Sequence, residues 1–199
     1  FIFILFAGAC IPAYFLSTLW MPMPNWLYII IVISAVVQIY AWISMVKLVK
    51  QNITLLKSKI DHFSRFLILY AAIALSIKLL LQLVATIPYI SHLAFSFRPI
   101  VIAYLHLVLL AFISVFLLSW LYSFNFIRRN KWSLTALIVF ITGVFLNEIT
   151  LMIQGIASIA YFPIPHINQT LFGITLIILI GTVLLFYSQS RSLPEKETF

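Results

Sequence analysis

The chain has 199 residues, of which 64% are hydrophobic and 8% are charged, and its formal net charge is +8. This composition excludes a water-soluble globule, because too little polar surface is present to cover one and several apolar runs exceed about 18 residues. Most Lys and Arg residues flank those runs, where anionic lipid headgroups account for them, so we expect a lipid bilayer and no nucleic acid as partner.

Crossing a bilayer takes about 20 apolar residues, and six stretches meet that length. The sequence therefore predicts an all-α fold, a polytopic transmembrane helix bundle with residues 1–187 as a single transmembrane domain. The first stretch begins at Phe1 without an initiator Met, which we interpret as a fragment lacking upstream helices. The predicted spans are Phe1–Leu19, Trp26–Leu48, Phe66–Ile87, Pro99–Leu121, Trp132–Ile156 and Ile167–Tyr187.

The segments between the spans are short. Pro22 and Pro24 predict a turn between the first two spans, because proline blocks helix continuation. In the longest connection, Val49–Arg65, apolar residues recur at three- and four-residue spacing, which favours an amphipathic segment on the membrane surface. A simple extension of the two flanking helices fits it equally well. Residues 188–199 read as a polar cytoplasmic tail.

Basic residues mark alternate connections, and such connections are cytoplasmic in membrane proteins. In the remaining connections, Arg98 is the only Lys or Arg residue. The distribution predicts an N-terminus outside, a C-terminus inside and an even number of spans. The basic residues on the predicted inner side are Lys47, Lys50, Lys57, Lys59 and Arg65, then Arg128, Arg129 and Lys131, and finally Arg191 and Lys196.

Motifs of soluble enzymes are absent from the sequence: it has no GxSxG, Walker or CxxC pattern. Its single cysteine, Cys10, excludes an internal disulfide, and we interpret it as a small buried residue. The four histidines are too scattered for HExxH or HxH metal ligation, and only His106 lies well inside a span.

Two ionisable residues, Lys78 and Glu148, fall deep inside predicted spans, where an unpaired charge is costly. Counted from the outer helix ends at about 1.5 Å per residue, both lie about 13 to 15 Å below the surface. We therefore expect an ion pair between them, with both groups charged. Such a pair serves either a functional site or the locking of two helices.

Further polar residues occur at similar depth. Gln82 follows Lys78 by one turn, Asn147 adjoins Glu148, and His106 lies in the fourth span. We predict a polar intramembrane site that opens outward. Its candidate residues are Lys78, Gln82, His106, Asn147 and Glu148, with Arg98, His92 and His166 at its mouth.

The segments ACIPAYFLSTLWMPMPNWLY, AIALSIKLLLQLVATIP, FRPIVIAYLHLVLLAFIS and NEITLMIQGIA resemble the carboxy-terminal half of an uncharacterised family of bacterial multi-pass inner-membrane proteins. That family is distantly similar to subunit I of haem-copper oxidases. The resemblance covers nearly the whole chain.

In the oxidases, the tenth of twelve spans carries an HxH pair that binds two haems. The resemblance places Tyr104-Leu-His106 over that pair, which implies His106 as an axial ligand of a low-spin haem b. Its axial partner would come from upstream helices of the same protein or from another membrane subunit. Tyr104 replaces the other haem ligand and the copper-site histidines are missing, so the resemblance does not imply oxygen reduction.

Three functions remain open at this stage. The first is a haem- or quinone-associated redox or sensing protein without a copper site, with the polar residues beside His106. The second is a small-solute or proton-coupled transporter in which Glu148 and Lys78 exchange partners. The third is a structural subunit of a membrane complex that binds no ligand.

Overall fold

The structure, a computed structural model, describes residues 1–15 and 24–190, and every regular element in those ranges is a helix. The segments α6, η2 and α7 form one continuous helix whose middle part, η2, has the wider turn of a π-helix. The elements are α1 (Ile2–Ala13), α2 (Asn25–Gln51), α3 (Ile53–Lys59), α4 (His62–Val84), α5 (Pro88–Ser96), α6 (Arg98–His106), η2 (Leu107–Ser114), α7 (Val115–Ser123), α8 (Lys131–Ile159) and α9 (Ile167–Ser190).

Five of the described helices are long and apolar enough to cross a membrane: α2, α4, the continuous helix α6–η2–α7, α8 and α9. They correspond to the second to sixth predicted spans. Only 11% of the most apolar window of α9 is buried within the chain, and the same holds for α6–η2–α7. Such broad apolar exposure is what lipid-facing helices present, so the chain has the structure of a multi-pass membrane protein.

The first predicted span is only partly described. Helix α1 has 12 residues, about 18 Å at about 1.5 Å per residue, which is shorter than the bilayer core of about 30 Å. Residues 16–19 of the predicted span, like Pro22 of the predicted turn, lie outside the described residues. Within the described ranges, α1 packs mainly on α2 and buries Ala9 there.

The connections contain two short helices. α3 interrupts the long connection between α2 and α4, and all of its residues are at least partly exposed. A turn at Asn52 and the non-helical residues Ile60 and Asp61 separate α3 from α2 and α4, so the connection is not a simple extension of those two helices. The sequence did not predict α5, which follows Ile87 and begins with Pro88, a residue whose fixed φ suits a first helical turn. Helix α9 continues to Ser190, so the first residues of the predicted tail are helical.

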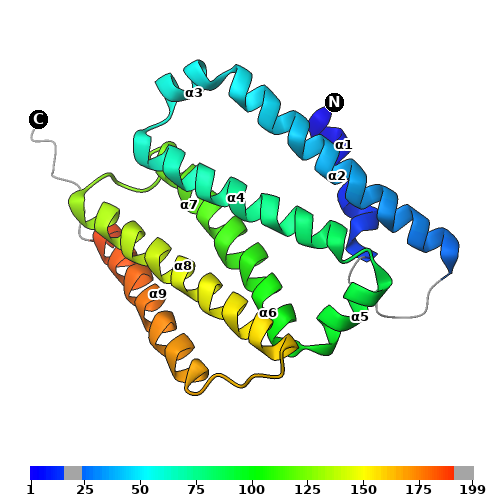
Figure 1. Cartoon of the computed structure of the whole chain (residues 1–199). Helices are drawn as coiled ribbons and strands as arrows, with labels where there is room; N and C mark the ends of the chain where they lie inside the picture. Colours follow the sequence, from blue (N-terminus) through cyan, green and yellow to red (C-terminus); the bar gives the residue numbers. More distant parts are fainter. Residues whose placement is uncertain (16–23, 191–199) are drawn as a thin grey trace, which may run out of the picture.

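The long helices form an open row rather than a closed bundle (Figure 1). α1 contacts α2, α2 contacts α4, and α8 contacts α9. The continuous helix joins the two halves diagonally, because its α7 end packs on α4 while its α6 end packs on α8.

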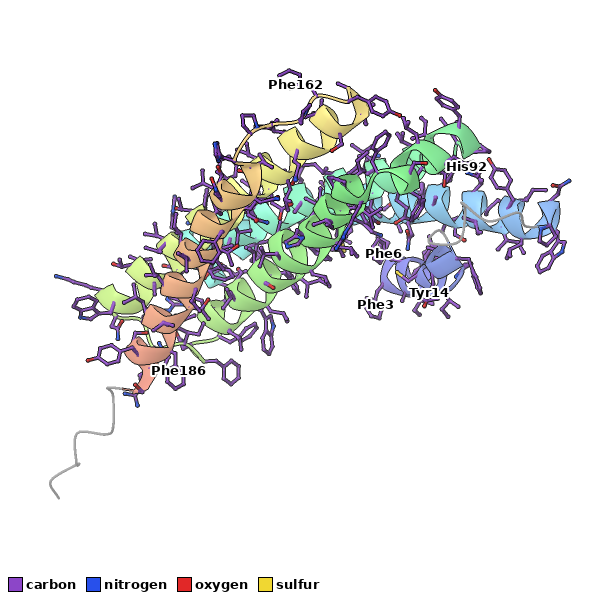
Figure 2. The ribbon with its side chains drawn as sticks, turned by 90° about the horizontal axis from the view of Figure 1, so that it is seen from below. Phe3, Phe6, Tyr14, His92, Phe162 and Phe186 are labelled. Carbon is purple, nitrogen blue, oxygen red and sulfur yellow. The ribbon has the colours of Figure 1, made fainter. Side chains whose placement is uncertain are left out.

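The connections between the long helices lie alternately at the two opposite ends of these helices. The α3 connection, the α7–α8 connection and the C-terminal end of α9 share one end (Figure 1). Figure 2 shows Phe186 of α9 at this end, with His92 and Phe162 towards the other. Eight basic residues of the described ranges belong to the first end, which is the distribution that the sequence predicted: Lys47, Lys50, Lys57, Lys59, Arg65, Arg128, Arg129 and Lys131.

The core lies where α4, the continuous helix and α8 meet. Small side chains allow close approach there, as is common between membrane helices. The buried residues of this core are Leu67, Ala71, Ala74, Ala111, Val115, Phe140, Ile141 and Val144. Between α8 and α9, contact is closer still: a methyl group on Gly181 would lie 2.7 Å from the backbone nitrogen of Phe140.

Candidate functional site

Lys78 does not pair with Glu148. Its Nζ donates a hydrogen bond to Oε1 of Gln82, one turn further along α4. The other partner, Glu148, has its Oε1 buried without a hydrogen-bond partner. The expected ion pair is therefore wrong for this structure.

The error comes from counting depth along separate helices, which ignores their tilt and rotation. α4 and α8 are held apart at this level by the continuous helix, which packs on both. Tyr70 of α4 lies within electrostatic range of Glu148. Tyr70 precedes Lys78 by eight residues, about 12 Å at about 1.5 Å per residue.

Lys78 instead begins a chain of hydrogen bonds that crosses three helices. Nε2 of Gln82 donates to Oε1 of Gln38 on α2 at 2.5 Å. Nε2 of Gln38 in turn donates to Sγ of Cys10 on α1 at 3.2 Å. Gln38 and Gln82 are only 1% and 4% exposed. We call these four residues the lysine chain.

The sequence reasoning missed Gln38 and Cys10 as members of this chain. Gln38 gave a usable signal, because a glutamine in the middle of an apolar span must find a polar partner. Trp42 Nε1 of α2 also donates to Ser76 Oγ of α4 at 2.9 Å, and Tyr28 OH of α2 donates at 2.8 Å to the carbonyl of Thr86, which follows α4. The lysine chain thus lies within a polar seam between α2 and α4.

A second polar cluster lies on α8. Asn147 is 5% exposed and its Nδ2 has no hydrogen-bond partner. Glu148, the next residue, is half-buried and its Oε1 is also unpartnered. Buried polar groups are normally hydrogen-bonded, and Ser64 and Arg65 near the start of α4 are another adjacent pair of exceptions. Glu148 differs from them because it is an acidic group in the middle of a helix of membrane-spanning length, which makes this position the candidate binding site. We call Tyr70, Asn147 and Glu148 the glutamate cluster.

Counted from one contact between α6 and α8, His106 and Glu148 lie at similar distances along their helices. A methyl group on Gly155 of α8 would lie 3.5 Å from Ile100 of α6, which fixes the register of these two antiparallel helices. His106 follows Ile100 by six residues on α6, and Ile149, the neighbour of Glu148, precedes Gly155 by six residues on α8. Six residues correspond to roughly 9 Å along each helix.

The imidazole of His106 is half-buried, and its Nδ1 is 2.9 Å from the carbonyl oxygen of Ile102. A carbonyl only accepts, so Nδ1 carries the proton and donates it there. Nε2 then keeps its lone pair, as a metal-binding histidine requires. The π-helical segment begins directly after His106, and π-turns often occur at functional sites.

Three predicted residues lie away from both clusters. Arg98 is exposed in the first turn of α6, at the end of the molecule predicted to face outward. His92 is exposed on α5. His166 is exposed before α9 with its Nδ1 2.6 Å from Oε1 of Gln169. The predicted single site is therefore divided: Lys78 and Gln82 belong to the α2–α4 seam, while Asn147, Glu148 and the level of His106 belong to α6 and α8.

Within residues 1–15 and 24–190, no three His, Cys, Asp or Glu side chains gather closely enough to hold a metal ion. One imidazole is enough to bind haem iron, so His106 alone satisfies this requirement for haem. No protein-family model, curated protein or solved structure matches the chain.

Proposed function

We propose that this chain belongs to a haem-associated redox or sensing protein of the bacterial inner membrane, similar to haem-copper oxidase subunit I but without its copper site. It crosses the membrane six times with its N-terminus outside. His106 would hold haem b through its Nε2, and the glutamate cluster would supply polar groups from the neighbouring helix α8. Haem iron would supply one-electron chemistry.

The observation that carries the haem proposal is the bond from His106 Nδ1 to the Ile102 carbonyl. It orients the ring and selects the tautomer in which Nε2 is free to bind iron. A second axial ligand would come from further helices of the protein or from another membrane subunit. Quinone is the alternative redox ligand for the same polar groups.

Visible spectra of the purified full-length protein, oxidised and dithionite-reduced, test this proposal. We expect the absorption bands of a b-type haem, and their loss in His106→Ala. His92→Ala is the matched control, because His92 is exposed on α5, and it should keep the bands. A haem-free spectrum from folded protein, or bands that persist in His106→Ala, would contradict the assignment.

The orientation is tested with single cysteines in a Cys10→Ser background. Lys57→Cys lies in α3, within the connection predicted to be cytoplasmic, and Pro163→Cys lies in the opposite α8–α9 connection. In intact cells, a membrane-impermeant thiol reagent should label position 163 and spare position 57. The reverse pattern would overturn the orientation.

A transporter is the second candidate, favoured by the unpartnered Oε1 of Glu148. A carboxyl group without a fixed partner is available to a solute or a coupling ion. Loss of uptake in Glu148→Gln, with normal expression and a featureless visible spectrum, would support transport over a haem function. A structural subunit would show neither haem nor uptake.

A further inference from the structure

Glu148 is a carboxyl group inside a helix of membrane-spanning length, and no Lys or Arg of residues 1–15 and 24–190 forms an ion pair with it. Its Oε1 is buried and unpartnered, and Lys78, the cation expected to pair with it, is hydrogen-bonded to Gln82 instead. A carboxylate removed from water without a partner is disfavoured by far more than a neutral acid. The arrangement is therefore stable when the carboxyl group carries no net charge.

The titratable groups on the neighbouring helices do not place a positive charge beside Glu148. Tyr70 of α4 lies within electrostatic range of Glu148. α6, which packs on α8, carries Tyr104 and His106, both half-buried, and the imidazole bonds to its own helix. α9 carries no Lys, Arg or His, and its single tyrosine, Tyr187, is near the far end.

We propose that Glu148 is an intramembrane proton-binding site. The carboxylate takes up one proton to form a neutral carboxylic acid and releases it again, with no electron transferred. Asn147 and Tyr70 are the polar neighbours available to the acid. The side chain of Asn147 is only 5% exposed and adjoins the carboxyl group, and its Nδ2 has no other hydrogen-bond acceptor among the described residues. This site does not depend on haem at His106.

The chain offers a clean labelling test. Of its four Asp and Glu residues, Glu148 alone lies within a long helix; Asp61 precedes α4, and Glu195 and Glu197 belong to the predicted tail. Dicyclohexylcarbodiimide dissolves in membranes and reacts with protonated carboxylic acids. The acid proton moves to a carbodiimide nitrogen, the carboxylate oxygen bonds to the central carbon, and the acyl group shifts to nitrogen to give a stable N-acylurea.

Peptide mass spectrometry of the full chain in membranes should locate this adduct on Glu148. We expect labelling that decreases as the pH rises, with a water-soluble carbodiimide labelling Asp61 and sparing Glu148. Asp61→Asn, the matched control, should leave the Glu148 adduct unchanged. Because the unmodified protein carries the test, misfolding of a variant cannot hide the result.

An infrared measurement gives a second readout. The carbonyl stretch of a protonated carboxylic acid should be present in the wild-type protein and absent in Glu148→Gln. Failure of the membrane-soluble reagent to label Glu148 at any pH would overturn the proposal, as would equal labelling of Glu148 and Asp61 by the water-soluble one. A haem-free protein with a labelled Glu148 would refute the haem proposal alone.

Discussion

The side-chain amide of Gln82 donates to the side-chain carbonyl of Gln38 at 2.5 Å, and this bond joins α4 to α2 inside the apolar part of the molecule. Each glutamine has a further partner, since Gln82 accepts from Lys78 and Gln38 donates to Cys10. The polar atoms of both amides are thereby used without water. This explains how two glutamines are accommodated within apolar helices that are long enough to cross a membrane.

Gln82→Leu should destabilise the protein. The change leaves Lys78 and Gln38 without their bonds, and an orphaned buried polar group costs about 1 to 3 kcal/mol. Unfolding in detergent or bicelles, followed by circular dichroism, measures the loss. The double variant Gln38→Leu/Gln82→Leu should show a coupling energy of about 0.6 to 1.7 kcal/mol, the range found between membrane helices.

Gln154→Leu is the control for this pair. Gln154 also lies in a long helix, α8, but its side chain forms no interhelical hydrogen bond among the described residues. Its replacement should change stability much less than that of Gln82. Equal losses at the two positions would show that the Gln38–Gln82 bond contributes nothing specific.

Ser119 and Ser64 give a second matched pair. Oγ of Ser119 on α7 donates to the backbone carbonyl of Ser64 on α4 at 3.0 Å, and both residues are fully buried. Ser119→Ala should therefore lower stability by about 0.5 to 1.5 kcal/mol. Oγ of Ser64 has no partner, so Ser64→Ala should be neutral or stabilising. The opposite ranking in unfolding measurements would refute this contact.

Two glycines of α9 should respond differently to alanine. A methyl group on Gly181 would approach the Phe140 backbone nitrogen to 2.7 Å, whereas one on Gly173 meets nothing within 4 Å. Gly181→Ala should push α9 away from α8 and destabilise the protein. Gly173→Ala should be tolerated and gain up to about 1 kcal/mol from helix propensity. Thermal unfolding and α8–α9 disulfide crosslinking would compare the two variants.

The start of α8 depends on Asn130. Its Oδ1 accepts from the backbone N–H of Ser133 at 2.6 Å, and Ser133 Oγ accepts in return from the Asn130 N–H at 3.1 Å. Asn130→Ala should cost about 0.5 to 2 kcal/mol, and Asn130→Asp should keep most of the stability because its side chain also caps. If both variants unfold alike, the cap is not what stabilises this end.

Much of the fold could be predicted from the sequence. Apolar runs of membrane-spanning length located α2, α4, the continuous helix, α8 and α9, because the need to satisfy backbone hydrogen bonds inside lipid leaves few alternatives to a helix. The short helix α5 was missed, since nine residues give too little periodicity. The last part of the first predicted span, residues 16–19, lies outside the described ranges.

The candidate site was predicted less completely. Lys78, Gln82, Asn147 and Glu148 stood out because polar residues are rare in such helices, and each does lie in a polar arrangement. Their partners were not predictable from depth alone. Depth along a helix gives one coordinate, whereas a contact also requires the rotation of each helix about its axis and the identity of its neighbours.

The sequence by itself determined that the five long segments are helices surrounded by lipid, since runs of that length and apolarity require a helix in a bilayer. It also determined which loops share a basic end. Only the tertiary structure decided that Lys78 bonds to Gln82 and Gln38 while Glu148 has no cation. The physical reason is the diagonal path of α6–η2–α7, which packs on α4 at one end and on α8 at the other and so separates the two charges.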